Sequence, residues 1–263
     1  MSQIDEVIGW LRDAKSVVAF TGAGISTESG IPDFRSPQGV WATNRQVQFH
    51  EFLESGPARF EYWRQKCVAH VEFHAAQPNA SHRILAEWER ADRLQAVITQ
   101  NIDGLHQLAG SRRVLELHGT ARQISCLHCG QRWDADPWVR QFVQSQAVPD
   151  CPECGGLLKN ATISFGQSLP EEDLENSIQL AENCDVMLAL GSSLVVHPAA
   201  GIPEVAQRRG ARLVIINRDS TPLDRIADAV LRTGLGETMS RIDEGWKNPG
   251  QSGANDSSCR YRT

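Results

Sequence analysis

The stretch Val17-Val18-Ala19-Phe20-Thr21-Gly22-Ala23-Gly24-Ile25-Ser26 decides the fold, because it joins an apolar run to a pair of glycines. The apolar run from Val17 to Phe20 is typical of a buried strand. The glycines permit a tight turn and let the backbone come close to a pyrophosphate. Ser26 and Thr27 suit the start of a helix, whose free N–H groups favour an anion. We therefore predict a strand, a nucleotide-binding turn and a helix.

An ordinary hydride-transfer enzyme is disfavoured by the residues that follow. Thr27 stands where the third glycine of the dehydrogenase fingerprint would be. That fingerprint also needs a second strand that ends in an acidic residue about 20 residues further on. Instead the chain continues into Pro32, Pro37, Gly39 and Trp41.

Five more short apolar runs have the character of buried strands, with helix-like segments between them. They span residues 96–99, 114–117, 186–190, 213–216 and 229–231. Near-continuous apolarity indicates strands that are buried on both faces, hence a parallel sheet covered by helices. Residues 203–210 read as a helix that ends in cations and a glycine, as in a right-handed βαβ unit. The predicted fold class is α/β, with a Rossmann-type parallel sheet and helices on both faces.

Two regions interrupt this pattern and are predicted to form a small second domain. One is aromatic and helical in character, and the other contains cysteines. The polar C-terminal stretch has almost no apolar residues and is predicted to be a disordered tail. The predicted large domain comprises 1–36, 78–121 and 159–246, the small domain 37–77 and 122–158, and the tail 247–263.

Four of the seven cysteines form two Cys-x-x-Cys pairs, Cys126/Cys129 and Cys151/Cys154, each followed by glycine. Thiolates at this spacing can surround a tetrahedral ion, which predicts a zinc ribbon. Free or redox-active thiols are the alternative. Four thiolates close the coordination shell, so the zinc is expected to be structural and not catalytic. His128 is expected to be an exposed loop residue.

The composition limits the possible partners. A net charge of −6 and a pI near 5.8 argue against binding of a nucleic-acid backbone and fit a basic peptide better. No apolar stretch approaches the ~20 residues of a membrane span, and the N-terminus lacks the pattern of an export signal. We expect a cytoplasmic protein that does not bind membranes.

Polar or glycine-rich loops follow the predicted strands, at the edge where open α/β sheets bind ligands. They are Gln100-Asn101-Ile102-Asp103, His118-Gly119, Gly191-Ser192-Ser193 and Asn217-Arg218-Asp219. Helix capping is the alternative explanation for Asn101 or Asp103, but it accounts for only one of them. A histidine at such an edge can titrate near neutrality. On the residues alone, His118 is as well explained by a structural role as by a catalytic one.

The ordered set of motifs resembles the sirtuin family of NAD-dependent protein deacylases, over about residues 16–239. The motifs are Gly22-Ala23-Gly24-Ile25-Ser26, Gly30-Ile31-Pro32-Asp33-Phe34-Arg35, Thr99-Gln100-Asn101-Ile102-Asp103, His118-Gly119, the paired cysteines, Phe165-Gly166 and Gly191-Ser192-Ser193-Leu194. The resemblance implies a cleft between the two domains that holds NAD and an acyl-lysine peptide. We also expect a monomer.

The resemblance also implies roles for individual residues. His118 would be the general base, Asn101 would act at the nicotinamide ribose, and Phe34 would cover that end of the site. The residues implied at the peptide are Ile163, Phe165, Gly166 and Leu194. Those implied at NAD are Gly22, Ala23, Gly24, Asp33, Phe34, Arg35, Gln100, Asn101, Asp103, Gly191, Ser192, Ser193, Asn217 and Leu235.

The implied reaction begins when the acyl oxygen attacks the nicotinamide ribose and nicotinamide leaves. His118 then removes a proton from a ribose hydroxyl, and water releases free lysine and O-acyl-ADP-ribose. Imidazole suits a base that works near neutral pH. Transfer of ADP-ribose to protein is the alternative within the same fold. A non-catalytic zinc-ribbon module and a zinc hydrolase are disfavoured, the latter because no open metal position is visible.

Two departures from the family pattern affect the acyl group and the surface. Gln167 and Asn160 stand where many relatives have a glutamate and a proline, and we expect an altered surface charge and no loss of catalysis. Desuccinylating members carry Tyr-x-x-Arg, whereas here Tyr62 is followed at that spacing by Gln65. A small neutral acyl group, above all acetyl, is therefore expected.

Overall fold

The computed structural model describes residues 2–33 and 45–248. Phe34 and Arg35, which the sequence places at NAD, lie outside these ranges. So do residues 37–44 of the predicted small domain and residues 249–263 of the predicted tail. The helix that precedes the tail ends at Lys247.

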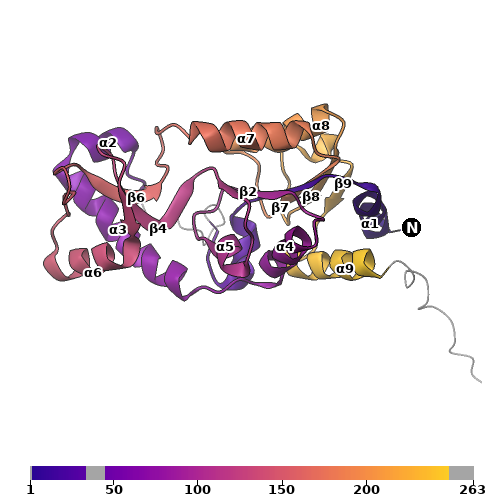
Figure 1. The fold of residues 1–263 in the computed structure, drawn as a ribbon, viewed down its shortest axis with the longest axis horizontal. Coiled ribbons are helices and arrows are strands. Elements are labelled where there is room, and N and C mark those ends of the chain that lie inside the picture. Colours follow the sequence, from indigo (N-terminus) through magenta and orange to yellow (C-terminus); the bar gives the residue numbers. More distant parts are fainter. Residues whose placement is uncertain (1, 34–44, 249–263) are drawn as a thin grey trace, which may run out of the picture.

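A six-stranded parallel sheet forms the larger part of the molecule, in the order β3-β2-β1-β7-β8-β9 (Figure 1). All six strands coincide with the predicted apolar runs to within one residue at each end. Every residue is buried in three of these strands, and in a fourth only the first residue is exposed. Because strands buried on both faces are continuously apolar, the sequence could predict them. Their bounds are β1 Val17–Thr21, β2 Ala96–Thr99, β3 Val114–Glu116, β7 Val186–Leu190, β8 Arg212–Ile216 and β9 Ala229–Leu231.

Helices cover both faces of this sheet, and each covering layer has its own apolar cluster (Figure 1). One face packs against α1 (Gln3–Asp13), α4 (Ala80–Arg90) and α9 (Leu235–Lys247), with the short α5 (Leu105–Ala109) beside α4. The other face packs against α7 (Glu171–Glu182) and α8 (Ile202–Arg208). The predicted α/β class is confirmed. Within residues 2–33 and 45–248, no helix is both long and apolar enough to span a membrane.

The strand order places a ligand-binding crevice between β1 and β7. From β1 the chain proceeds outward through β2 and β3, and from β7 it proceeds the opposite way through β8 and β9. The loops after β1 and β7 therefore diverge from a shared point, where open α/β sheets bind ligands. The Gly24 N–H donates a hydrogen bond of 2.8 Å to the Gly191 carbonyl across this point.

The helix expected to start at Ser26 is a 3-10 helix, η1, which spans Ala23–Ser29. Ser26 lies inside it and is buried, so it does not cap a helix. The reason is tertiary: the Gly24 N–H is already bonded to the Gly191 loop, and Gly30 ends the segment with φ of 83°. A short, tight helix satisfies both constraints.

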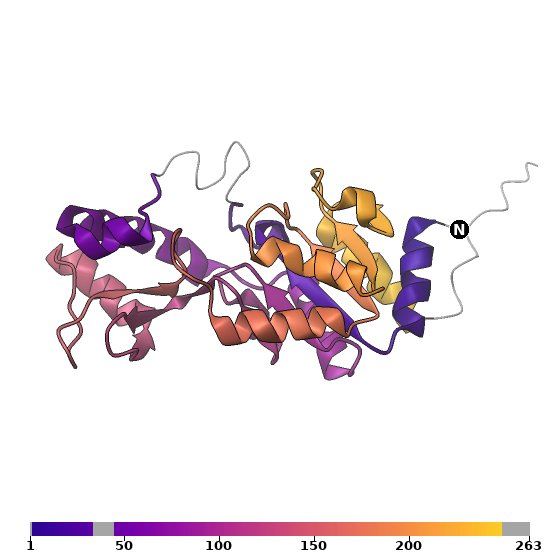
Figure 2. The ribbon, with the colours of Figure 1, turned by 90° about the horizontal axis from the view of Figure 1, so that it is seen from above.

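A smaller module lies at the end of the molecule away from the N-terminus (Figure 2). It contains α2 (Phe49–Glu54), α3 (Gly56–Ala75), α6 (Ala135–Ser145) and a three-stranded sheet in the order β5-β4-β6. Its strands are β5 Arg132–Asp134, β4 Gly119–Cys126 and β6 Leu158–Thr162. Phe52, Tyr62, Trp63, Phe142 and Leu158 form its core. Two short 3-10 helices, η3 (Ala199–Gly201) and η4 (Asp224–Ile226), complete the described fold.

Strands β4 and β6 connect this module to the parallel sheet. They pair antiparallel, from Gly119 with Thr162 to Cys126 with Leu158. The boundaries proposed at 121/122 and 158/159 therefore fall within paired strands.

Candidate active site

A cavity of about 1040 Å³ lies where the carboxyl ends of the parallel strands face the small module. This volume is slightly above the ~300–1,000 Å³ that is typical of ligand sites, so the cavity has room for a dinucleotide and a lysine side chain. Of the residues proposed from the sequence, the cavity is lined by Gly22, Ala23, Gly24, Asp33, Gln100, Asn101, His118, Ile163, Phe165, Gly166, Gly191, Ser192, Ser193 and Asn217.

The glycines in this cavity are required by close backbone packing. A Cβ on Gly24 would lie 2.8 Å from the Gly191 Cα, and one on Gly22 would lie 2.9 Å from the Ser192 Cα. Gly191 also has φ of 59°, which side chains rarely adopt. The two loops therefore form a surface of backbone atoms, which suits a pyrophosphate.

A buried relay of hydrogen bonds fixes Asn101. Its backbone N–H donates to the Thr99 hydroxyl at 3.0 Å, and its side-chain amide donates to Ser26 Oγ at 3.1 Å. The Ser26 hydroxyl in turn donates to Asp103 Oδ2 at 2.7 Å. Asn101 lines the cavity, so the relay holds one amide at a set position in the site.

Asp103 is not part of the cavity lining and acts on it only through its hydrogen bond with Ser26. Its other oxygen accepts from the N–H of Leu105, the first residue of α5, at 2.9 Å. The N-cap of α5 is Gly104, which makes no side-chain cap bond, so the alternative interpretation of Asp103 as the N-cap residue is wrong. Burial raises the pKa of Asp103, while the bonds from Leu105 and Ser26 and the charge of Arg122 lower it. Removing a bond partner would therefore favour protonation of this carboxyl.

His118 follows β3 and presents one ring nitrogen to the backbone. His118 Nδ1 lies 2.9 Å from the Gln100 carbonyl oxygen, an acceptor only, so Nδ1 carries the proton. In the neutral ring this makes Nε2 the basic nitrogen. His118 lines the cavity beside Asn101, which gives the site a base of the type that proton transfer near neutral pH requires.

The segment after β6 forms the opposite wall. The Ile163 N–H donates a hydrogen bond of 2.8 Å to the His118 carbonyl, so the backbone of this wall is bonded directly to the backbone of His118. Phe165 is 43% exposed although it lines the cavity. An accessible aromatic ring on a cavity wall is suited to an apolar part of a ligand.

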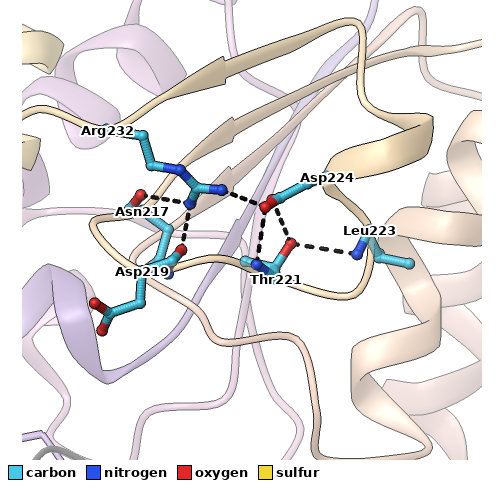
Figure 3. Close-up of polar contacts among 6 residues, drawn as sticks. All are labelled: Asn217, Asp219, Thr221, Leu223, Asp224 and Arg232. Carbon is cyan, nitrogen blue, oxygen red and sulfur yellow. Dashed lines mark hydrogen bonds and ion pairs between the residues drawn. The ribbon is translucent and has the colours of Figure 1, made fainter.

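At the far end, a hydrogen-bonded cluster holds the loop after β8 (Figure 3). Arg232 donates to the carbonyls of Asn217 and Asp219 and pairs with Asp224. Burial raises the pKa of Asp224, but hydrogen bonds from Thr221 and Arg232 outweigh it and lower the pKa. The carboxylate therefore stays ionised and the loop stays braced. Asn217 and Asp219 line the cavity from this loop.

The comparisons with known proteins agree with this arrangement. The Sir2 family model matches residues 22–198. The chain belongs to the Sir2 family. It is 49% identical to the NAD-dependent protein deacetylase 1 of Bradyrhizobium diazoefficiens over 240 residues, 90% of this chain and 94% of the relative. It is 47% identical to the NAD-dependent protein deacetylase of Rhodopseudomonas palustris over 241 residues, 90% and 95% of the two chains.

Solved Sir2 structures have the same fold. A Sir2 complex with p53 peptide and NAD+ superimposes with a TM-score of 0.83 at 37% identity, over 93% of this chain and 98% of that one. A Sir2 variant in complex with deacetylated p53 peptide and 3'-O-acetyl-ADP-ribose gives a TM-score of 0.84 at 38% identity, over 92% and 98%.

The four cysteines of this Sir2 chain converge as the ribbon prediction requires. Their sulfur atoms all lie within 4.8 Å of one another, with Cys126 to Cys154 at 3.5 Å and Cys129 to Cys151 at 3.7 Å. A tetrahedron with Zn–S bonds of about 2.3 Å has edges of about 3.8 Å. The donor set therefore fits one zinc ion, which would join the two Cys-x-x-Cys turns.

Besides Asp103, two residues that the sequence placed at ligands lie outside the cavity lining. Leu194 is 2% exposed and packs under the parallel sheet, with φ of 53°. Leu235 begins α9 and packs against the core on the opposite face. Their roles at peptide and adenosine stay predictions from the resemblance.

Two lysines near the cavity were not predicted. Lys66 lines the cavity one turn after Tyr62 on α3, and its ammonium lies 5.4 Å from the centroid of the Tyr62 ring. Lys159 lies across the same ring and is only 1% exposed. Burial, with the charge of Lys66, lowers the pKa of Lys159 to about 7. Tyr62 and Lys66 stand four residues apart, a helical spacing that could have revealed their pairing. No sequence signal marks Lys159.

Proposed function

We propose that this chain is an NAD-dependent protein-lysine deacetylase that releases nicotinamide, O-acetyl-ADP-ribose and deacetylated lysine. The observation that carries the proposal is the position of His118. Its Nδ1–H is held by the Gln100 carbonyl, and its ring lines a glycine-walled cavity beside Asn101. The family and the names of its relatives support the same activity.

The residues present fit NAD as the co-substrate. The backbone surface of Gly22, Gly24 and Gly191 would hold the pyrophosphate, and Asn217 and Asp219 would lie toward the adenosine. Asn101 would hold the nicotinamide ribose. Bound NAD would supply a ribose that carries a cationic leaving group and hydroxyls able to accept the acyl group. A zinc ion held by the four cysteines would have a structural task, since four sulfur ligands would complete its coordination shell.

The chain's own contribution is proton transfer and positioning. His118 Nε2 would take the proton of a ribose hydroxyl and thereby raise its nucleophilicity, a contribution of about 10²–10⁴ in rate. Asn101 would keep the ribose in place through the relay that Ser26 and Asp103 fix. The Ile163 N–H bond to His118 would keep the peptide wall in register with the base.

We infer a small neutral acyl group on a lysine side chain as the substrate. Gln65, which lines the cavity, offers an amide where a guanidinium would bind an acyl carboxylate. Lys66, the next residue on α3, is a cation that also lines the cavity, and it makes the preference for a neutral acyl group testable. If the protein turned over a succinyl-lysine peptide as fast as an acetyl-lysine peptide, and Lys66→Gln lost this activity, the preference for a neutral acyl group would be contradicted.

The deciding experiment follows an acetyl-lysine peptide by mass spectrometry, with and without NAD. We expect deacetylated peptide and O-acetyl-ADP-ribose only with NAD, and a loss of at least 100-fold in His118→Ala. His50→Gln, an exposed histidine on α2, should match the unchanged protein. ADP-ribose attached to protein, with the peptide unchanged, would instead establish the transferase alternative.

We further propose that the protein works as a monomer in the cytoplasm. Four cysteines committed to a metal suit a reducing compartment, where thiols persist. Size-exclusion chromatography with light scattering tests the first point: a mass near 29.1 kDa is expected. Fractionation of the source cells tests the second.

A further inference from the structure

A second cluster of metal-ligating side chains lies in the small module, apart from the cysteines. His70 and His74 are one turn apart on α3, so their rings share a face of the helix and stack with centroids 5.6 Å apart. Asp136, in the first turn of α6, faces both rings. One ligand atom from each of the three residues lies within 4.8 Å of the other two.

The distances are close to those of a bound ion. Asp136 Oδ1 lies 2.6 Å from His70 Nε2 and 3.4 Å from His74 Nδ1. A tetrahedral ion with bonds of about 2.0–2.2 Å to nitrogen and oxygen separates its ligands by about 3.4 Å. One contact already has that separation, and the other needs to open by less than 1 Å.

The burial of the three side chains suits an ion that keeps one water. His70 is 15% exposed and Asp136 29%, so two ligands are held by their surroundings, while His74 is 60% exposed and can adjust. Asp136 is further fixed by its backbone N–H, which donates to Asp134 Oδ1 at 2.8 Å. Three protein ligands on one side leave a fourth position open to solvent.

We propose that His70, His74 and Asp136 form a second site, for a divalent d-block cation such as Zn²⁺, Ni²⁺ or Co²⁺. Two imidazoles and one carboxylate favour these ions over Mg²⁺ and Ca²⁺, which take oxygen ligands. The ion would join α3 of the helical insertion to α6 of the ribbon insertion.

The test uses the full chain with zinc in its ribbon, dialysed against NiCl₂ near neutral pH. Metal analysis should give about one bound nickel per chain in addition to the zinc. His74→Gln and Asp136→Asn should each weaken nickel binding by at least tenfold, since even the loss of an indirect partner costs about 10–100-fold in metal affinity. The exposed His50→Gln serves as the matched control and should bind as the unchanged protein does.

Thermal unfolding separates a shared site from scattered surface binding. Nickel should raise the melting temperature of the unchanged protein and of His50→Gln, but not of His74→Gln, because only an ion held by both helices binds the folded state selectively. Binding that is equal in all variants, or no nickel beyond the ribbon zinc, would overturn the proposal and leave the trio as a hydrogen-bonded ion pair. A thiolate-to-nickel absorption band would also count against it, because it would place the ion in the ribbon.

Discussion

At the scale of single residues, Ser26 is the contact on which the site most depends. Its hydroxyl accepts from Asn101 and donates to Asp103, and all three side chains are buried. The sequence motif that contains Ser26 predicted its importance, but as a helix start. Its role as a link could not be predicted, because Asn101 and Asp103 are more than 70 residues away in the chain.

Ser26→Ala should therefore lower catalysis without unfolding the protein. It leaves the Asn101 amide and one Asp103 oxygen buried without this partner, at a cost of about 1–3 kcal/mol. We expect kcat/KM for NAD to fall by about ten- to 100-fold, measured as nicotinamide release. Ser145→Ala, at the exposed end of α6, should leave the rate unchanged. Equal rates for both variants would show that the relay does not position Asn101.

At the scale of elements, the glycine loops after β1 and β7 act as one unit. A methyl group on Gly24 would lie 2.7 Å from the Gly191 carbonyl oxygen, too close for both loops to keep their places. Gly24→Ala should lower the free energy of unfolding by about 1–3 kcal/mol through overpacking and raise the KM for NAD.

Gly9→Ala provides a control of opposite sign for this prediction. Gly9 lies inside α1, and a Cβ there would have no neighbour within 4 Å. Alanine in a helix interior should stabilise the fold by about 0.5–1 kcal/mol and leave the KM unchanged. Urea unfolding and NAD kinetics measure both variants. A Gly24→Ala protein as stable and active as Gly9→Ala would refute the packing argument.

The elements also differ in how far sequence alone could predict them. The four central parallel strands were predictable because they are buried on both faces and their residues are therefore almost all apolar. The sheet of the small module was not, since β6 contains Lys159 and Asn160 and β4 alternates irregularly between buried and exposed residues. Its pairing depends on the contact between distant strands, which no local pattern records.

At the scale of the whole molecule, two buried histidines make stability depend on pH. The His82 and His106 rings lie 4.8 Å apart between α4 and α5, and both are fully buried or nearly so. Burial, with a smaller contribution from Arg83, lowers the pKa of His82 to about 4, and burial lowers that of His106 well below its usual value. The folded state therefore resists protonation that the unfolded state accepts.

The free energy of unfolding should fall as the pH is lowered from about 6.5 to about 4. In that window the unfolded state binds more protons, so stability rises with pH. His82 alone accounts for about 3 kcal/mol, at about 1.4 kcal/mol per pKa unit. His82→Phe should flatten this slope in urea unfolding, whereas His50→Gln should not. Loss of the ribbon zinc in acid affects both variants equally. If the free energy of unfolding changed with pH in the same way for both, the assignment of the slope to His82 would be wrong.

The whole-molecule arrangement explains why the candidate site was predictable only in part. Residues at the ends of apolar strands were found, since such ends meet at one edge of a sheet. The groups that the sequence did not reveal come from the small module, whose helices and ribbon are distant in sequence and come into contact only in the folded chain. They are Lys66, Lys159 and the cluster of His70, His74 and Asp136. Tertiary packing alone brings Lys159 to Tyr62 and Asp136 to the two histidines. The pairs within α3, Tyr62 with Lys66 and His70 with His74, follow from their spacing of four residues.

The bond between the Ile163 N–H and the His118 carbonyl has a consequence for how the enzyme tolerates motion. It lies beside the paired Gly119 and Thr162, where β4 and β6 leave the parallel sheet for the small module. His118 is also bonded to the dinucleotide side of the site, through its Nδ1–H and the Gln100 carbonyl, so one residue is bonded to both parts of the molecule. A displacement of the small module would therefore act on the base directly, which links the position of the peptide wall to proton transfer.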